Sequence, residues 1–289
     1  MIWQFVINGL ITGILYSVLA IGFALVYNTT RIFHIAAAGI YVFAAFMFWL
    51  FVSTVGCPVL LASIIAIVLS ALLSLVTELW VYRPLKNRKA SLNVLMIASI
   101  GLMTIIVNMM AMLFGNETKV ISSSTMAPLH LGDIIITMPQ AFQAMVGILV
   151  LLLFVITLQR SDWGVRLRAL SADESLYETL GYDTNLTRVI VFLVSGAFIA
   201  VASCLTVYDV GLDPNMGMNV LINAIVAMII GGSGRFNTCI LGGLSLGVLQ
   251  SLTVYQFASN WQNAVTFVVL LLFLFLRPQG IAGYKQRTV

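Results

Sequence analysis

A few polar side chains interrupt apolar stretches of the sequence, where they could hydrogen-bond a polar solute. They are Asn8, Thr12, Asn108, Asn219 and Asn223, with Ser195, Ser203 and Gln250 in similar settings. Polar groups inside apolar spans face protein or water, which makes them candidates for a solute path. For each of them, a hydrogen bond between neighbouring helices is an equally good interpretation. Asn219 and Asn223 stand one helical turn apart and would share a face, so for this pair solute contact and packing are evenly balanced.

The polar loop 160–187 contains the pattern of a short capped helix. Ser171 begins a capping box, in which its hydroxyl accepts from the backbone N–H of Glu174 and Glu174 reaches back. Gly181 can take the left-handed conformation that ends a helix. We therefore predict a helix over 172–180.

Three apolar residues of this predicted helix, Leu176, Tyr177 and Leu180, fall on one face by helical spacing. Such a ridge can dock into a groove of a partner protein. It can equally cover the ends of the chain's own helices, and spacing alone does not choose between the two.

Several kinds of chemistry have no residues to support them. The glycine-rich stretch 231–235 lacks the spacing and the lysine of a phosphate-binding loop, so ATP hydrolysis is not expected on this chain. Cys57, Cys204 and Cys239 lie far apart without metal-ligand spacing. We predict no catalytic residue, no metal site and no enzymatic activity.

Composition points to lipid as the solvent of these elements. Of 289 residues, 61% are hydrophobic and 8% are charged, which is far below the roughly 25% charged residues of soluble domains. A spanning helix needs about 20 apolar residues. The candidate spans are 4–26, 35–55, 58–81, 92–114, 140–159, 188–209, 217–233, 238–257 and 261–276.

The predicted fold is therefore an all-α integral membrane protein, a polytopic bundle of about nine transmembrane helices with a range of eight to ten. Broken or re-entrant half-helices stay open for 35–55, 92–114 and the glycine-rich end of 217–233. The apolar stretch 2–27 predicts a retained first helix rather than a signal peptide. We treat 1–289 as a single transmembrane domain that includes the loop 160–187.

Basic residues predict the orientation, because loops rich in Lys and Arg stay in the cytoplasm. With nine spans, all of the 14 Lys and Arg except Lys119 fall on one side. This places the N-terminus outside and the C-terminus inside. The inner set is Arg31, Arg83, Lys86, Arg88, Lys89, Arg160, Arg166, Arg168, Arg188, Arg235, Arg277, Lys285 and Arg287. The basic residues form short clusters at segment ends instead of a stripe, so nucleic acid is not an expected partner.

An ordered set of motifs along most of the chain resembles the branched-chain amino acid ABC transporter permease family. The motifs are Gly9–Gly13 with Tyr16, Ala20, Gly22 and Tyr27; Glu78 to Tyr82–Leu85; Ile97–Gly101 to Asn108; Gly231–Gly234; Leu241–Gly243 with Gly247; and Arg277–Pro278 with Gly280. The loop helix resembles the coupling segment of ABC importer permeases, which docks on an ATPase. The chain departs from the family's pattern at Phe33–Gly39, where Asn-Phe-Ala-His-Gly is usual, and at Ser175–Tyr177, where two alanines are usual.

The resemblance implies a permease subunit of an ABC importer in the bacterial inner membrane that carries branched-chain or similar hydrophobic amino acids. It implies a second permease subunit, homologous or identical, two cytoplasmic ATPases that hold ATP and magnesium, and a periplasmic substrate-binding protein. No cofactor is expected on this chain itself. The coupling residues would be Ser171, Glu174, Leu176, Tyr177, Leu180 and Gly181. The alternatives are a related permease for urea or short amides and an ion-coupled secondary transporter, which the lack of a charge at mid-span disfavours.

Overall fold

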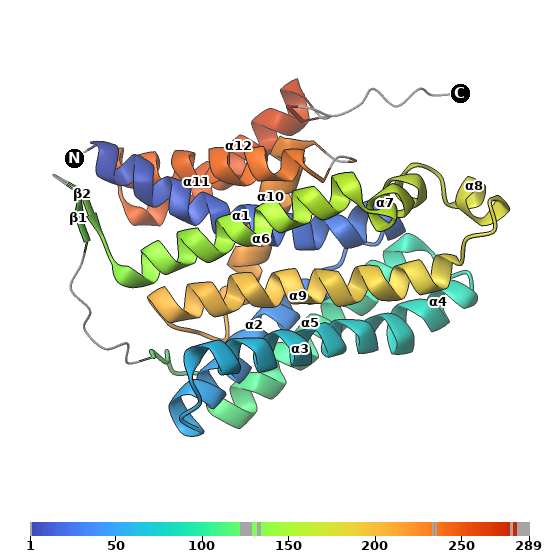
Figure 1. The fold of residues 1–289 in the computed structure, drawn as a ribbon, viewed down its shortest axis with the longest axis horizontal. Coiled ribbons are helices and arrows are strands. Elements are labelled where there is room, and N and C mark those ends of the chain that lie inside the picture. The colour runs from blue at the N-terminus through green and yellow to red at the C-terminus, as the bar shows by residue number, and fades with distance from the viewer. Residues whose placement is uncertain are drawn as a thin grey trace. The chain divides into compact units, whose positions relative to one another are not determined.

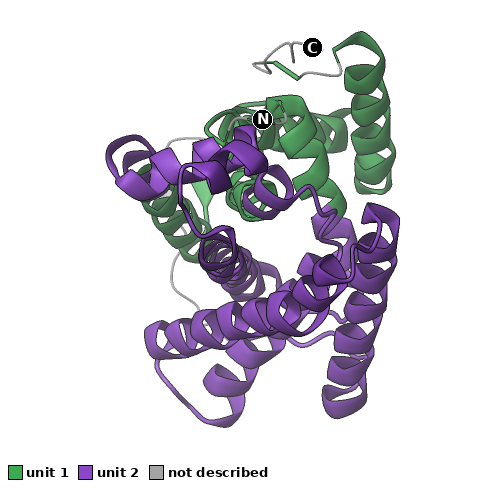
Figure 2. Cartoon of the chain, turned by 90° about the vertical axis from the view of Figure 1, so that its right-hand side faces the viewer, with its two compact units in different colours: residues 1–24, 123–153, 222–289 green, residues 25–122, 154–221 purple. Residues whose placement is uncertain are grey.

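The computed structural model of the protein describes residues 2–121, 129–131, 134–232, 234, 236–277 and 280–281. Position 233 of the glycine-rich motif, Arg235, Pro278, Lys285 and Arg287 lie outside these residues. The described chain forms two compact units (Figure 2). Unit 1 comprises 1–24, 123–153 and 222–289, and unit 2 comprises 25–122 and 154–221.

Within the described residues, eight helical stretches are long and apolar enough to cross a membrane. They consist of α1 (Ile2–Thr30), α2 with η1 (Ala36–Trp49, Leu50–Thr54), α3 with η2 and α4 (Val59–Thr77, Glu78–Tyr82, Arg83–Asn87), α5 (Leu92–Phe114), α6 (Met138–Arg160), α9 (Thr184–Val210), α11 (Thr238–Gln256) and η3 with α12 (Ser259–Trp261, Gln262–Leu276) (Figure 1). A further apolar helix, α10 (Met216–Gly231), has 16 residues, fewer than the roughly 20 that a full span needs. The predicted all-α bundle of eight to ten passes is confirmed.

The remaining described elements are short. The helices α7 (Asp162–Ala172) and α8 (Glu174–Thr179) connect α6 to α9. The strands β1 (Leu129–Leu131) and β2 (Ile134–Ile136) form an antiparallel hairpin in which Leu129 pairs with Ile136. In unit 1 the Gln4 side chain bonds both backbone groups of Ile135, at 2.8 and 2.9 Å, and so joins the hairpin to α1.

Small residues let α3 and α9 of unit 2 pack closely. The buried face of α3 carries Ala62, Ala66, Ser70 and Ser74. A Cβ on Gly196 of α9 would lie 2.6 Å from the Ser74 Cβ and 3.0 Å from the Ala71 Cα. The Ser74 hydroxyl donates to the carbonyl of Phe192 at 2.7 Å. Without a hydrophobic force between helices in lipid, this close backbone approach and the hydrogen bond hold the pair together.

At each end of unit 2, loops that the charge pattern assigns to the same side of the membrane contact each other. At one end, Arg31 donates to the carbonyl of Ser171 at 3.1 Å. At the other end, Lys119 exchanges two backbone hydrogen bonds with Leu212, at 2.9 and 2.8 Å, and its ammonium lies 4.6 Å from the ring centre of Trp49. The loops predicted to share a side therefore meet.

Candidate functional site

The predicted loop helix exists, but it begins later than the sequence pattern suggests. Asp173 has extended backbone angles and separates α7 from α8. Its carboxylate accepts from the backbone N–H groups of Ser175 and Leu176, at 2.8 and 3.2 Å. Ser171 belongs to α7, and its hydroxyl donates to the carbonyl of Arg168 at 2.9 Å. The predicted capping box at Ser171 is therefore wrong, and Asp173 is the cap.

The ionised form of Asp173 suits this role. The hydrogen bond from the Ser175 hydroxyl, at 2.7 Å, and those from the two backbone N–H groups favour the carboxylate, which lowers the pKa of Asp173 below its usual value. The cap is thus fully charged at neutral pH, at the positive end of the helix dipole.

The end of the helix is confirmed as predicted. Gly181 has a φ of +83°, in the left-handed region, and its N–H donates to the carbonyl of Glu178 at 2.9 Å. Nothing lies within 4 Å of the Cβ position of Gly181, so the glycine serves the backbone conformation and not a close approach.

The apolar ridge of α8 is narrower than predicted. Leu176 and Leu180 are 58% and 63% exposed, whereas Tyr177 is 1% exposed. The Tyr177 hydroxyl is 2.9 Å from the hydroxyl of Thr187 on α9, and its ring stacks on Tyr182 at 5.1 Å. Leu176 precedes Tyr177 and therefore points about 100° away from it on the helix, and Leu180 follows the last residue of α8. Tyr177 therefore packs against its own unit, while the two leucines stay exposed.

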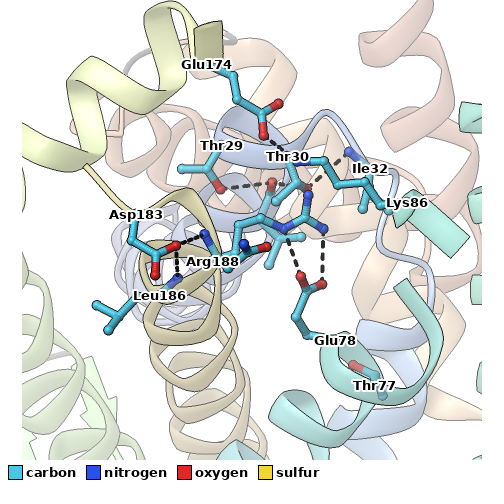
Figure 3. Close-up of polar contacts among 12 residues, drawn as sticks. Thr29, Thr30, Ile32, Thr77, Glu78, Lys86, Glu174, Asp183, Leu186 and Arg188 are labelled. Carbon is cyan, nitrogen blue, oxygen red and sulfur yellow. Dashed lines mark hydrogen bonds and ion pairs between the residues drawn. The ribbon is translucent and has the colours of Figure 1, made fainter. Parts of the chain in front are cut away.

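A salt bridge joins the first turn of α8 to α4. The ammonium of Lys86 pairs with the carboxylate of Glu174 (Figure 3), and both side chains are about 40% exposed. At the other end of α8, Glu178 accepts from the hydroxyl of Thr184 at 2.8 Å. The helix is thereby fastened to α4 and to α9 while its leucines stay free.

Next to these contacts lies a buried ion pair that the sequence did not reveal as a pair. The Arg188 guanidinium of α9 donates from Nε and Nη2 to the two oxygens of Glu78, at 2.8 and 3.2 Å (Figure 3). The two side chains are 3% and 2% exposed. Such a two-point pair fixes both distance and orientation. It joins the end of α9 nearest α8 to the π-helical turn η2.

The departure from the family's pattern at 33–39 forms a buried hydrogen-bonded cluster. His34 Nδ1 is 2.9 Å from the Tyr82 hydroxyl, which donates to Ser99 at 2.8 Å. The Ser99 hydroxyl also accepts from the backbone N–H of Ala36, at 2.8 Å. Burial lowers the pKa of His34 to about 3, so the imidazole is neutral at neutral pH. This cluster holds the start of α2 against α5.

The residues predicted to line the solute path lie in different parts of the structure. Asn8 and Thr12 line a cleft of about 200 Å³ in unit 1, together with Phe5, Gly247, Gln250, Ser251, Val254 and Gln262. The Asn8 amide oxygen accepts from Gln4 at 3.3 Å, and the Thr12 hydroxyl donates to the carbonyl of Asn8 at 3.0 Å. The cleft offers only uncharged polar groups beside apolar ones.

Asn223 takes part in packing within unit 1. Gln250 of α11 donates to the Asn223 amide oxygen at 3.0 Å and to the Thr266 hydroxyl at 2.6 Å. The Tyr16 hydroxyl donates to the Gln250 amide oxygen at 2.8 Å. This arrangement connects α1, α10, α11 and α12. Asn219 is exposed whereas Asn223 is buried, so the predicted pair does not form one polar surface.

The exposed side of α5 carries the remaining candidate. Thr104 and Asn108 are exposed at spanning depth, and the Asn108 amide donates to the carbonyl of Thr104 at 2.7 Å. Nothing lies within 4 Å of the Cβ position of Gly101, one turn away. This polar stripe is not covered by the described part of the chain.

Comparison with known proteins covers nearly the whole sequence. The family described as the permease component of branched-chain amino acid transport systems matches residues 5–274. The high-affinity branched-chain amino acid transport system permease protein BraD of Pseudomonas aeruginosa is 26% identical over 98% of this chain and 96% of its own. LivH of Escherichia coli K12, a permease protein of the same kind of system, is also 26% identical with the same coverage.

Similarity to solved structures supports the fold. A chain of PsaBC from Streptococcus pneumoniae, solved in complex with a Fab, superimposes with a TM-score of 0.51 at 15% identity. The match covers 94% of this chain and 91% of that one. With the family match over 5–274, the comparisons identify the chain as a multi-pass membrane protein that belongs to the branched-chain amino acid transport system permease family.

Proposed function

We propose that this protein is the membrane permease subunit of an ABC importer for branched-chain or similar hydrophobic amino acids. The observation that carries the proposal is α8, a capped helix at the Lys- and Arg-rich end of the spans that presents Leu176 and Leu180 outward. The family match over 5–274 supports this function over a urea permease or an ion-coupled transporter.

The proposed assembly contains a second permease, homologous or identical, and a periplasmic binding protein. Two cytoplasmic ATPases would bind ATP and magnesium and hydrolyse the ATP, because this chain has no phosphate-binding loop. The chain would lie in the inner membrane with its N-terminus outside and its C-terminus in the cytoplasm. The distribution of the 14 Lys and Arg supports this orientation.

The contacts of α8 suggest how movement reaches the spans. When the ATPases close, the force on Leu176 and Leu180 would pass through the Lys86–Glu174 pair to α4 and through Tyr177 to Thr187 of α9. The Glu78–Arg188 pair joins α9 to η2, which continues α3. The inner ends of α3 and α9 would therefore move together, and the bundle would tilt.

Truncating the ridge tests this role. Leu176→Ala with Leu180→Ala should release the ATPase or uncouple ATP hydrolysis from uptake, because buried interface anchors can each contribute about 2 kcal/mol, roughly a thirtyfold change. ATPase pull-down and amino acid uptake in reconstituted vesicles would measure both effects. Since both side chains are exposed, the stability of the isolated permease in detergent should hardly change.

Tyr177→Phe provides the matched control, because it keeps the ring and removes the hydroxyl bond to Thr187. It should lower stability by about 1 kcal/mol and still retain the ATPase. A double leucine variant that binds the ATPase and couples normally would refute the coupling role of α8.

For the path, the α5 stripe with Asn108 and Thr104 is the best supported candidate. Exposed polar groups at this depth need protein or water beside them, which a second permease or a hydrated path would provide. Asn108→Leu should lower uptake about three- to tenfold, the effect of one lost hydrogen bond, without reducing ATPase binding. Met112→Leu, an apolar exchange on the same helix at a residue 90% exposed, is the control. Unchanged uptake in Asn108→Leu would remove this residue from the path.

A further inference from the structure

The exposed face of α3 is uniformly apolar. Its residues recur every three or four positions and are 41–53% exposed: Leu61, Ile64, Val68, Leu72 and Val76. Such spacing forms one continuous stripe on a helix. The exposed side of α5, by contrast, carries Thr104 and Asn108. An unbroken apolar stripe needs only lipid beside it, whereas the α5 stripe needs protein or water.

The α3 stripe ends at an aromatic residue and a basic cluster. Trp80, one turn after Val76, is 79% exposed, and Trp is enriched where lipid meets water. Arg83, Arg88 and Lys89 follow, and all three are exposed. The sequence 79–91 contains no acidic residue. Within the described part of the chain these three cations form no ion pair, whereas their neighbour Lys86 pairs with Glu174.

We propose that Trp80, Arg83, Arg88 and Lys89 form a binding site for the headgroup of an anionic phospholipid. The guanidinium groups can each give two parallel N–H donors to a phosphate, and the lysine adds a compact charge. The indole N–H of Trp80 can donate at the same level, and the acyl chains would lie along the α3 stripe. Because Lys86 pairs with Glu174 of α8, the lipid belongs to the leaflet on the α8 side.

The cluster differs from the basic residues at the ends of two other exposed helices. The helices α6 and α12 also have exposed apolar faces. Arg160 ends α6, and the exposed Arg166 and Arg168 follow it, but Arg168 donates to the carbonyl of Leu158 and Arg166 lies 5.2 Å from the ring centre of Tyr182. At the end of α12 the described residues include one exposed basic residue, Arg277. One basic side chain near an anionic surface attracts lipid weakly, and clusters attract it strongly. The site is therefore expected at α3–α4 and not at α6 or α12.

Lipid retention tests the site. The full-length permease would be reconstituted in nanodiscs of phosphatidylcholine mixed with phosphatidylglycerol, and co-purifying lipid would be measured by native mass spectrometry. The wild type should retain phosphatidylglycerol in preference to phosphatidylcholine. Arg83→Gln with Arg88→Gln and Lys89→Gln should weaken this retention at least about tenfold.

Two control variants make the outcome specific. Arg160→Gln with Arg277→Gln should retain phosphatidylglycerol as the wild type does, and Arg83→Lys with Arg88→Lys should keep most of it. Equal retention in the triple glutamine variant would overturn the proposal, as would an equal loss in the Arg160/Arg277 variant. Displacement of the lipid by inorganic phosphate would show a site for free anions and would also overturn it.

Discussion

Replacing Arg188 with methionine should destabilise the folded permease by about 3–5 kcal/mol, because Glu78 would stay buried without a counter-charge. Both side chains are nearly inaccessible, and the guanidinium satisfies both carboxylate oxygens. Thermal unfolding in detergent would measure the loss. The double variant Glu78→Leu with Arg188→Met should recover most of the stability, since an apolar pair of similar volume removes the uncompensated charge.

The Lys86–Glu174 pair is the matched control, because it lies on the same side of unit 2 but is about 40% exposed. Exposed pairs contribute at most about 1 kcal/mol, so Lys86→Met should have a small effect on unfolding. If Arg188→Met were no more destabilising than Lys86→Met, the buried pair would not hold α9 to η2.

Gly247→Ala should destabilise the protein by about 3 kcal/mol, the upper part of the usual range for overpacking. A Cβ at Gly247 would lie 2.4 Å from the carbonyl oxygen of Gly9 and 2.5 Å from the Cα of Gly13. These are backbone atoms, which cannot turn aside as a flexible side chain can. In return, a Cβ at Gly13 would lie 2.8 Å from the Cα of Leu244. The contact is thus mutual, as between two small-residue faces of membrane helices.

Gly101→Ala is the control for this prediction. It replaces a glycine in the interior of another spanning helix, where nothing lies within 4 Å of the added atom. Alanine also favours the helix by about 1 kcal/mol over glycine, so stability should hold or rise. Unfolding temperatures in detergent would separate the two variants, and equal effects would contradict the close packing of α1 on α11.

The number and position of the helices could be predicted because the length of each apolar segment can be read directly from the sequence, without knowing how the chain folds. Each predicted apolar segment contains a helix, and the segment 217–233, with its glycine-rich end, is the short helix α10. The glycines near 242–247 serve close helix packing, since a Cβ on Gly242 would lie 1.9 Å from the carbonyl oxygen of Ala227.

Partners distant in sequence could not be predicted. The charges of Glu78 and Arg188 were visible, but no local pattern joins residues on different helices. The prediction that Ser171 caps α8 was wrong for another reason. Serine and aspartate cap helices about equally well, and the extent of α7 to Ala172 decides in favour of Asp173. Helical spacing gave Asn219 and Asn223 one face, yet only Asn223 meets the Gln250 amide.

The composition of unit 1 has a consequence for biosynthesis. Its residues come from 1–24, 123–153 and 222–289, so its first segment is synthesised well before its last. The glycine face of α1 reaches the membrane long before α11, against which it packs. Unit 2 ends at 221 and can pack earlier. A nascent chain that stops before α11 should therefore hold a folded unit 2 and an α1 whose Gly9 and Gly13 still face lipid or the insertion machinery.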